Sequence, residues 1–255
     1  MTSKVIISGA SSGIGRALAF EYSKRGATLA LISRRKKELL DLQKKLTCAC
    51  FIYDMDVNDI NACQKMANHF IKQVGTPDII IANAGISHGT LSEHYDDLIT
   101  FQKIVGTNLF GVLNLFQPFI KIFQSKKAGS LVGISSVAGI RGLPGASAYS
   151  SSKSALTNYL EALRVELSEY NINVTNISPG YIKSPMTAVN QYPMPFIMDV
   201  EKAAKKIIKA IDTKRKFIII PWQMALIGKI MHFLPIFLWD WFAKRGPKKP
   251  RKIQD

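Results

Sequence analysis

The chain alternates short, uninterrupted apolar runs with longer segments of helical hydrophobic spacing, and the alternation starts close to Met1. The apolar run at residues 5–8 leads into a segment in which Ile14, Leu18 and Tyr22 recur at helical spacing. Strands that are apolar at every position are typical of a parallel sheet whose two faces are both covered by helices. The pattern therefore predicts a doubly wound α/β fold.

The same reading assigns elements along most of the chain. Strands are expected at residues 5–8, 28–33, 49–54, 78–82, 129–135, 172–177 and 216–220. Helices are expected at residues 14–24, 36–46, 61–74 and 147–170. No repeat or low-complexity linker interrupts the 255 residues, a length that suits one α/β domain. We expect this domain to span residues 1–220, followed by an apolar and basic extension at residues 221–255.

Three glycines follow the first expected strand, where the first expected helix begins. Gly9, Gly13 and Gly15 form a Gly-x-x-x-Gly-x-Gly pattern, which differs in spacing from Gly-x-Gly-x-x-Gly. Glycines permit a tight turn and let backbone amides approach a pyrophosphate at the positive end of a helix. The pattern predicts a dinucleotide-binding turn, with a packed turn that binds nothing as the alternative.

Two arginines, Arg34 and Arg35, follow the second expected strand. An enzyme that selects NAD normally has an acidic residue near this position, whereas a basic side chain accommodates the 2′-phosphate of NADP. The arginines therefore favour NADP(H). The alternative is that they begin a solvated helical face together with Lys36 and Lys37.

Tyr149 and Lys153 lie one turn apart on one face of an expected helix, with Ser136 thirteen positions upstream and Asn108 further back. A fixed cation favours a phenolate and lowers the tyrosine pKa from its usual value of about 10. The pair suits proton transfer at a carbonyl or an alcohol. Taken alone, it also fits an exposed helical face that carries one aromatic residue.

Taken together, these motifs resemble the classical short-chain dehydrogenase/reductase family over about residues 4–220. The segments that carry the resemblance are residues 8–15 (SGASSGIG), Asn83-Ala84-Gly85, Asn108, Ser136, Tyr149-x-x-x-Lys153 and Pro179-Gly180. The family's own glycine spacing matches that of this chain. The resemblance implies a Rossmann fold, an NADP(H) cofactor, a homodimer or homotetramer, and hydride exchange between nicotinamide and a carbonyl or alcohol.

The resemblance also implies roles for the catalytic residues. Tyr149 would be the general acid or base, and Ser136 would hold and polarise the substrate oxygen. Lys153 would bind the nicotinamide ribose and lower the pKa of Tyr149, and Asn108 would hold a water that passes protons onward. The neighbouring Ser135 is the alternative to Ser136, and Asn108 could instead be a capping amide.

A longer set of residues is expected to bind the cofactor. Asp56 would contact adenine, Asn83 and Gly85 would contact adenosine and the central sheet, and Ile182 would contact the nicotinamide carboxamide. The full set is Gly9, Ser11, Ser12, Gly13, Ile14, Gly15, Arg34, Arg35, Asp56, Val57, Asn83, Ala84, Gly85, Tyr149, Lys153, Pro179, Gly180, Ile182 and Ser184. His88 and His94 could line the pocket or lie in a partly exposed loop.

The net charge of +16 indicates attraction to phosphates, nucleic acids or anionic lipid. No nucleic-acid recognition motif accompanies it, so we expect no nucleic-acid partner. No cluster of metal-ligating residues suggests a catalytic metal, and Cys48, Cys50 and Cys63 are expected to be reduced structural thiols. No secretory signal is recognisable, which favours a cytoplasmic location.

The segment at residues 184–198 is apolar and lies where the family has its substrate-covering loop and helix. It favours an apolar substrate, such as an acyl chain, a sterol or a quinone-like ring, and a lid that only packs on the core is an equally open alternative.

The extension combines three tryptophans, Trp222, Trp239 and Trp241, with a basic stretch at residues 244–252. Charged and proline residues interrupt its apolar run, so we do not expect a membrane-spanning helix. The alternatives are an anchor on an anionic membrane surface at its inner face, or packing against the core or a second subunit. In outline the arrangement is similar to membrane-associated lipid-metabolising reductases such as the 3-ketodihydrosphingosine reductases.

Two other functions remain open at this point. The chain could be a non-catalytic NADP(H)-binding sensor, or a membrane-associated scaffold, because a fold does not by itself determine a function.

Overall fold

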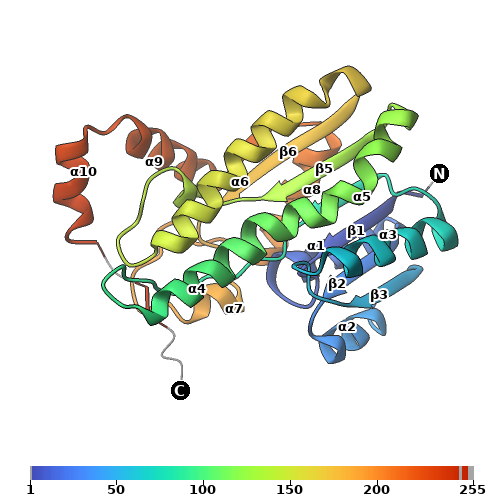
Figure 1. Cartoon of the computed structure of the whole chain (residues 1–255), viewed down its shortest axis with the longest axis horizontal. Helices are drawn as coiled ribbons and strands as arrows, with labels where there is room; N and C mark the ends of the chain where they lie inside the picture. The colour runs from blue at the N-terminus through green and yellow to red at the C-terminus, as the bar shows by residue number, and fades with distance from the viewer. Residues whose placement is uncertain (1, 247–248, 252–255) are drawn as a thin grey trace.

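The structure is a computed structural model that describes residues 2–246 and 249–251. Its centre is a sheet of seven parallel strands in the order β3-β2-β1-β4-β5-β6-β7 (Figure 1). The strands are β1 (Lys4–Ser8), β2 (Thr28–Ser33), β3 (Cys50–Asp54), β4 (Ile79–Ala82), β5 (Gly129–Ile134), β6 (Ile172–Pro179) and β7 (Phe217–Ile220). The predicted doubly wound α/β fold is confirmed, and each expected strand forms within two residues of its expected bounds.

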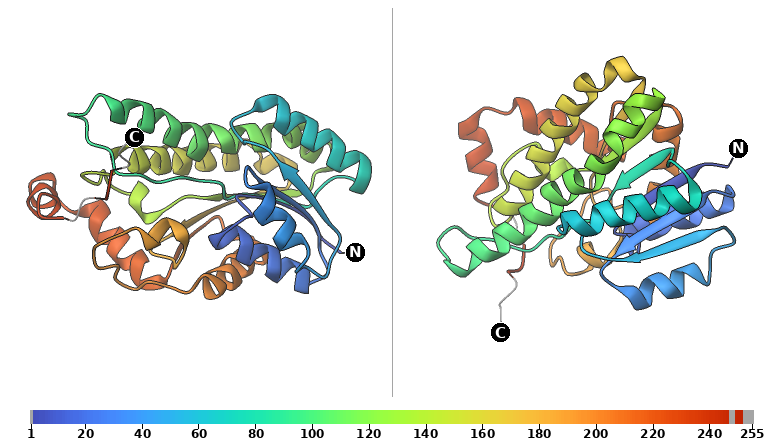
Figure 2. Two further views of the ribbon diagram at one scale, coloured as in Figure 1. Left: turned by 90° about the horizontal axis from the view of Figure 1, so that it is seen from below. Right: turned by 45° about the vertical axis from the view of Figure 1, so that its right-hand side comes forward.

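Helices cover both faces of the sheet (Figure 2). Helices α1 (Gly13–Lys24) and α8 (Val200–Asp212) pack on one face, and α3 (Ile60–Val74), α5 (Gly111–Lys126) and α6 (Ser147–Glu166) pack on the other. Side chains along each strand alternate between the two cores: Val5 and Ile7 of β1 join one core and Ile6 joins the other. This two-sided burial explains why the strands are apolar at every position.

The second helix in the chain, α2 (Lys36–Gln43), lies beside the edge strand β3 and its neighbour β2. Helix α6 ends at Glu166 and a 3₁₀ turn over Ser168–Tyr170 follows, closed by Asn171 in the left-handed conformation at φ 54°. The expected helices at residues 36–46 and 147–170 are therefore shorter than predicted at their C-terminal ends.

The sequence patterns predict no helix between residues 83 and 128, where the structure has a long one. It comprises α4 (Asp96–Val105), a π-helical turn (Gly106–Phe110) and α5. The π turn shifts the hydrophobic spacing, and Pro118 lies within α5, so no single helical period runs through the segment.

By length and composition, the 31-residue helix Asp96–Lys126 is the one candidate for a membrane span among the described residues. Phe116, Phe119 and Phe123 of this helix are fully buried against the sheet. A core helix of an α/β domain meets the same criteria of length and composition, and its packing here is that of a core helix.

Two helices follow the last strand, α9 (Trp222–Phe233) and α10 (Ile236–Ala243). Helix α9 lies against β7 and against the turn that follows β5. There a Cβ atom on Gly180 would come within 2.6 Å of Met224, and one on Gly228 within 2.6 Å of Ile140. The first part of the extension therefore packs on the domain at the carboxyl end of the sheet.

Candidate active site

The glycine turn joins β1 to α1 in a backbone conformation that requires glycine. Gly9 has φ +65° and Gly13 has φ +52°, both in the left-handed region. The Asn83 amide donates hydrogen bonds to the carbonyl oxygens of Ser8 (3.0 Å) and Gly9 (3.3 Å). Asn83 therefore fastens the turn to the end of β4.

Replacing Gly15 with alanine is expected to lower both the melting temperature and the affinity for NADPH. A Cβ at Gly15 would lie 2.4 Å from the carbonyl oxygen of Gly9 and 2.6 Å from the Asn83 amide nitrogen, so the turn must shift. Overpacking of this kind costs about 1–3 kcal/mol. Gly142→Ala is the matched control, because a Cβ there meets no atom within 4 Å. Equal melting temperatures for the two variants would contradict the close packing of the turn.

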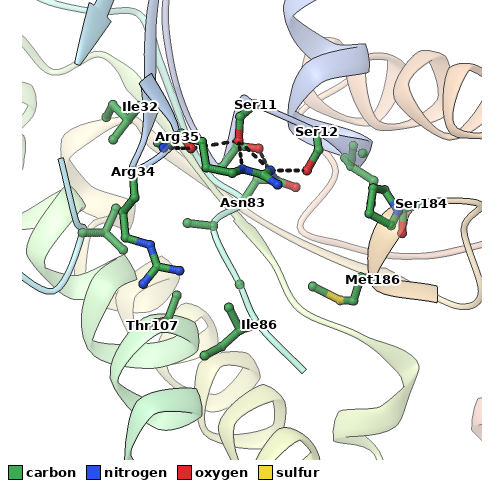
Figure 3. A pocket seen from close by; sticks show the side chains of 18 of the residues that line it. Ser11, Ser12, Ile32, Arg34, Arg35, Asn83, Ile86, Thr107, Ser184 and Met186 are labelled. Atoms are coloured by element: carbon green, nitrogen blue, oxygen red, sulfur yellow. Dashed lines mark hydrogen bonds between the residues drawn. The ribbon is translucent and has the colours of Figure 1, made fainter. Parts of the chain in front are cut away.

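A pocket of about 390 Å³ opens over this turn at the carboxyl ends of β1, β2, β3 and β4 (Figure 3). Ligands bind at this edge in open α/β sheets. The predicted residues that line it are Gly9, Ser11, Ser12, Gly13, Ile14, Arg34, Arg35, Asp56, Val57, Asn83, Ala84, Gly85 and Ser184. The other predicted residues lie outside its lining: Gly15, Asn108, Ser136, Tyr149, Lys153, Pro179, Gly180 and Ile182.

The two arginines after β2 occupy different parts of this pocket. Arg35 donates from Nη2 to the hydroxyls of Ser11 (2.7 Å) and Ser12 (2.6 Å), and Figure 3 shows its guanidinium directed at the glycine turn. Its backbone N–H donates to the Ser33 hydroxyl at 3.1 Å. Arg34 extends towards the opposite wall and pairs with Asp56 at 3.4 Å. The structure thus separates two arginines that the sequence could not distinguish.

This wall of the pocket fits an anionic ligand. Helix α1 begins at Gly13, its Ser12 N-cap makes no side-chain capping bond, and its first turn carries no acidic residue. Backbone amides at a helix N-terminus attract phosphate groups, and Arg35 adds a fixed positive charge beside them. The residues present therefore suit the phosphate groups of a dinucleotide.

Tyr149 lies near the start of α6, is half-buried, and shares a hydrogen bond with Ser136 just beyond β5. Ser136 also donates to the Pro179 carbonyl at 3.4 Å. Ser135, in contrast, donates to the Lys153 carbonyl at 2.9 Å and contacts the Thr157 hydroxyl. Ser136 is therefore the serine placed to act together with Tyr149.

Burial raises the pKa of Tyr149, and the hydrogen bond with Ser136 only partly opposes this effect. The effect of Lys153 on that pKa stays a prediction, because the shift comes from burial and from Ser136. The Lys153 Nζ is 5.8 Å from the Tyr149 ring centre and donates to the Ile134 carbonyl at 2.7 Å. Burial lowers the pKa of Lys153 itself to about 8.

Asn108 lies on the π-helical turn between α4 and α5 and is completely buried. Its carboxamide accepts from the Ile86 N–H (2.8 Å) and donates to the Ile86 carbonyl and the Ser152 hydroxyl, each at 3.0 Å. A Cβ at Gly85 would lie 3.1 Å from the Asn108 Oδ1 and 3.7 Å from the Lys153 Nζ. Gly85, which lines the pocket, therefore also lies beside Asn108 and Lys153.

The remaining predicted residues lie near the end of β6 and beyond it. The Ile182 side chain is buried in the core. The Ile182 backbone forms a β-bridge with Met198, and its carbonyl accepts a hydrogen bond from the Thr187 hydroxyl at 2.6 Å. Ser184 precedes the short helix α7 (Pro185–Ala188) and lies on the pocket wall. Of the two histidines, His88 lines the pocket, whereas His94 lies outside it beside Glu93.

Several residues that line the pocket were not predicted from the sequence: Ile32, Ser33, Met55, Ile86, Ser87 and Thr107. Pro185 and Met186, which also line it, belong to the expected lid at residues 184–198. Ser33, Met55 and Ile86 directly follow or precede predicted residues, and that adjacency is the signal that could have identified them. Thr107 comes from the π turn, whose position no pattern indicated.

The end of the described chain lies against the loop at residues 86–97. Arg251 forms two hydrogen bonds to the buried Asp97 carboxylate (2.8 and 3.2 Å), which lowers the pKa of that carboxyl group. Lys249 donates to the Ser87 hydroxyl at 2.9 Å, and the Gly89 N–H donates to the Pro250 carbonyl at 2.9 Å. For the basic stretch at 244–252, contact with anionic lipid and packing against the core or a second subunit were the alternatives. Lys249 and Arg251 fasten the tail to a pocket loop.

The described residues give little support to metal-dependent or thiol-based chemistry. Among them, no group of three His, Cys, Asp or Glu side chains could hold a metal ion. The three cysteines are free thiols, and burial raises the pKa of Cys50 to about 12 and of Cys63 to about 11. Protonated thiols are poor nucleophiles, which agrees with a structural role.

Comparisons with known proteins agree with this geometry. A family model described as short chain dehydrogenase matches residues 3–193. An uncharacterized oxidoreductase of Myxococcus xanthus is 34% identical over 243 residues, covering 94% of this chain and 96% of that protein. The 11-beta-hydroxysteroid dehydrogenase-like 2 protein of Arabidopsis thaliana is 34% identical over 240 residues, covering 91% of this chain and 77% of that protein.

Solved structures share the fold. A short-chain dehydrogenase from Streptomyces avermitilis has a TM-score of 0.82 at 23% identity, covering 96% of this chain and 99% of that one. A short-chain dehydrogenase from Sphingobium yanoikuyae in complex with NADPH has a TM-score of 0.76 at 22% identity, covering 95% and 93%. The family model and the relatives together establish the kinship. The chain belongs to the classical short-chain dehydrogenase/reductase family of NAD(P)-dependent oxidoreductases.

Proposed function

We propose that the protein is an NADP(H)-dependent reductase that converts an apolar carbonyl compound into the corresponding alcohol. The proposal rests mainly on the hydrogen-bonded pair of Tyr149 and Ser136. Lys153 and Gly85 lie between this pair and the pocket over the glycine turn. At the far side of that pocket, Arg35 is placed to hold a 2′-phosphate. Bound NADPH would supply the hydride.

The protein's own residues supply the proton. Tyr149 donates it to the carbonyl oxygen of the substrate, and Ser136 shares in holding that oxygen as negative charge develops on it. Reduction requires Tyr149 in its protonated form, which a phenol with a raised pKa retains at neutral pH. Lys153, with its pKa lowered to about 8, can return a proton to Tyr149 near neutral pH. Asn108 positions this cluster through Ile86 and Ser152.

The expected lid supports an apolar substrate. Met186, Val189, Phe196 and Ile197, all between residues 184 and 198, are exposed in the structure and do not pack on the core. Exposed apolar side chains beside an active site are available to cover an apolar ligand. The steroid named for the A. thaliana relatives belongs to the same substrate class.

An NADPH-oxidation screen over ketones of graded chain length and ring size tests this function. We expect turnover with NADPH to exceed that with NADH, and to increase with the apolar size of the ketone. Comparable rates with the two cofactors would contradict the role given to Arg35. NADPH binding without turnover of any ketone would favour a non-catalytic sensor or scaffold instead.

We also propose that the protein forms a homodimer or homotetramer, as the family resemblance implies. Ile99, Phe110 and Val165, on the helical layer made of α4 to α6, are exposed apolar residues that such contacts would cover.

A further inference from the structure

Helix α9 has apolar side chains on the face that points away from the protein. Trp222, Leu226, Ile230 and Phe233 recur at helical spacing and are 70%, 56%, 55% and 79% exposed. Met224 and Gly228, on the opposite face, are buried against the domain. A surface helix normally has the reverse arrangement, with its apolar stripe towards the core. The outer stripe of α9 therefore has no partner within the described chain.

Helix α10 continues this surface at one end of the molecule, where it projects from the domain (Figure 1). None of its eight residues is buried, and five apolar ones are exposed. These five are Ile236, Phe237, Leu238, Trp241 and Phe242. At 3.6 residues per turn, they occupy about two thirds of the helix circumference.

Contacts with the domain hold this projecting helix in place. The Arg141 guanidinium lies 5.1 Å from the Trp239 ring centre and donates to the Leu234 carbonyl at 3.2 Å, in the turn between α9 and α10. These contacts fix the position of α9 and α10 on the domain. We call the apolar surface of the two helices the outer apolar face.

Positive charges border the outer apolar face. Its segment at residues 222–246 contains Lys229, Lys244 and Arg245 against a single acid, Asp240. Lys229 lies on the exposed stripe between Leu226 and Phe233, and the Arg245 guanidinium stacks 4.2 Å from the Trp241 ring centre. Tryptophan beside arginine or lysine is the composition of a helix that rests at a lipid headgroup boundary.

We propose that the outer apolar face docks the protein on the surface of an anionic phospholipid bilayer. The helices have 12 and 8 residues, too few to span a bilayer that requires about 20. A second copy of the chain would cover one side of α10, whereas its apolar residues point to several sides. A bilayer boundary accommodates all of these directions, and its anionic headgroups complement the basic border.

The docked orientation would bring the active site close to the bilayer. The buried side of α9 contacts Ile140 and Gly180, which lie next to Ser136 and the end of β6. An apolar carbonyl compound dissolved in lipid would then be close to the site. This consequence rests on the proposed function, whereas the docking itself does not.

Vesicle flotation of the full chain, without cofactor or substrate, tests the docking. We expect binding to vesicles of phosphatidylcholine with phosphatidylglycerol, and much weaker binding to phosphatidylcholine alone or at high salt. The double variant Leu226→Glu/Ile230→Glu should lower the bound fraction at least about tenfold, because each substitution removes an aliphatic side chain that the bilayer would bury. Ile60→Glu/Leu40→Glu is the matched control, since both residues are exposed elsewhere and should leave binding unchanged.

A second pair of variants isolates the charge. Lys244→Gln/Arg245→Gln should reduce binding to anionic vesicles roughly 25-fold, because about 1 kcal/mol per basic residue corresponds to roughly fivefold each. Lys205→Gln/Lys206→Gln, a pair of exposed lysines on α8, should have no such effect. Retained NADPH binding by all variants shows that they are folded.

Three outcomes would overturn the proposal: no binding to either vesicle, equal binding to both, or binding that the α9 variant leaves intact. Light scattering without lipid addresses the other occupant. Loss of a dimer on Leu226→Glu/Ile230→Glu, with no vesicle binding by the unaltered protein, would assign the outer apolar face to a second copy. Failure of the ketone screen alone would leave the docking result standing.

Discussion

Tyr149→Phe is expected to lower turnover of the best ketone by about 10²–10⁴-fold, the usual contribution of a positioned general acid. The change removes only the hydroxyl of a half-buried ring, and with it the hydrogen bond to Ser136. The dissociation constant for NADPH should change little, because the pocket lining does not include Tyr149. Steady-state kinetics and NADPH fluorescence titration measure the two quantities.

Tyr22→Phe provides the matched control. Tyr22 is a buried tyrosine whose hydroxyl has no hydrogen-bond partner. This residue lies two turns beyond the glycine turn, near the end of α1. Its replacement should leave turnover unchanged. If Tyr149→Phe kept full turnover, Tyr149 could not be the proton donor. If it abolished NADPH binding as well, the effect would be structural rather than catalytic.

Arg35→Asp is expected to reduce kcat/KM with NADPH by about 10–100-fold, while kcat/KM with NADH stays the same or rises. Loss of hydrogen bonds to a charged group costs about 1.5–3 kcal/mol, and 1.4 kcal/mol corresponds to a factor of ten. The new carboxylate would also repel a 2′-phosphate and could accept from a ribose 2′-hydroxyl. Parallel kinetics with the two cofactors give the ratio directly.

Lys37→Asp separates the local effect from the general loss of positive charge. It makes the same charge change two residues further on, at an exposed position of α2 outside the pocket lining. We expect the NADPH preference to persist in that variant. An equal loss of preference in both variants would show that Arg35 acts only through the overall positive field.

The fold could be predicted because its strands are apolar at every position and are separated by helical periods. Two-sided burial imposes that signal on residues such as Val5, Ile6 and Ile7, whatever the function. The segment from Asp96 to Lys126 carries no such clear signal. Its π turn and Pro118 break the helical period, so its helix can be recognised only from its packing against the sheet.

The candidate site was predictable where residue type and spacing both matter. The interval to Tyr149 favoured Ser136 over Ser135, and the hydrogen bonds of the two serines agree with that choice. The rise in the pKa of Tyr149 was not predictable, because it comes from burial, and burial is a property of the folded protein. The separate positions of Arg34 and Arg35 likewise depend on side-chain directions that a sequence does not contain.

The pair between Arg251 and Asp97 joins residues 154 positions apart, which has a consequence for biosynthesis. The last strand ends at Ile220, so the sheet can be complete while Arg251 has yet to be translated. Until then the Asp97 carboxylate would be buried without its cation, an arrangement that is strongly unfavourable. We therefore expect the loop at residues 86–97 to reach its final conformation only late in synthesis, after the rest of the domain has folded.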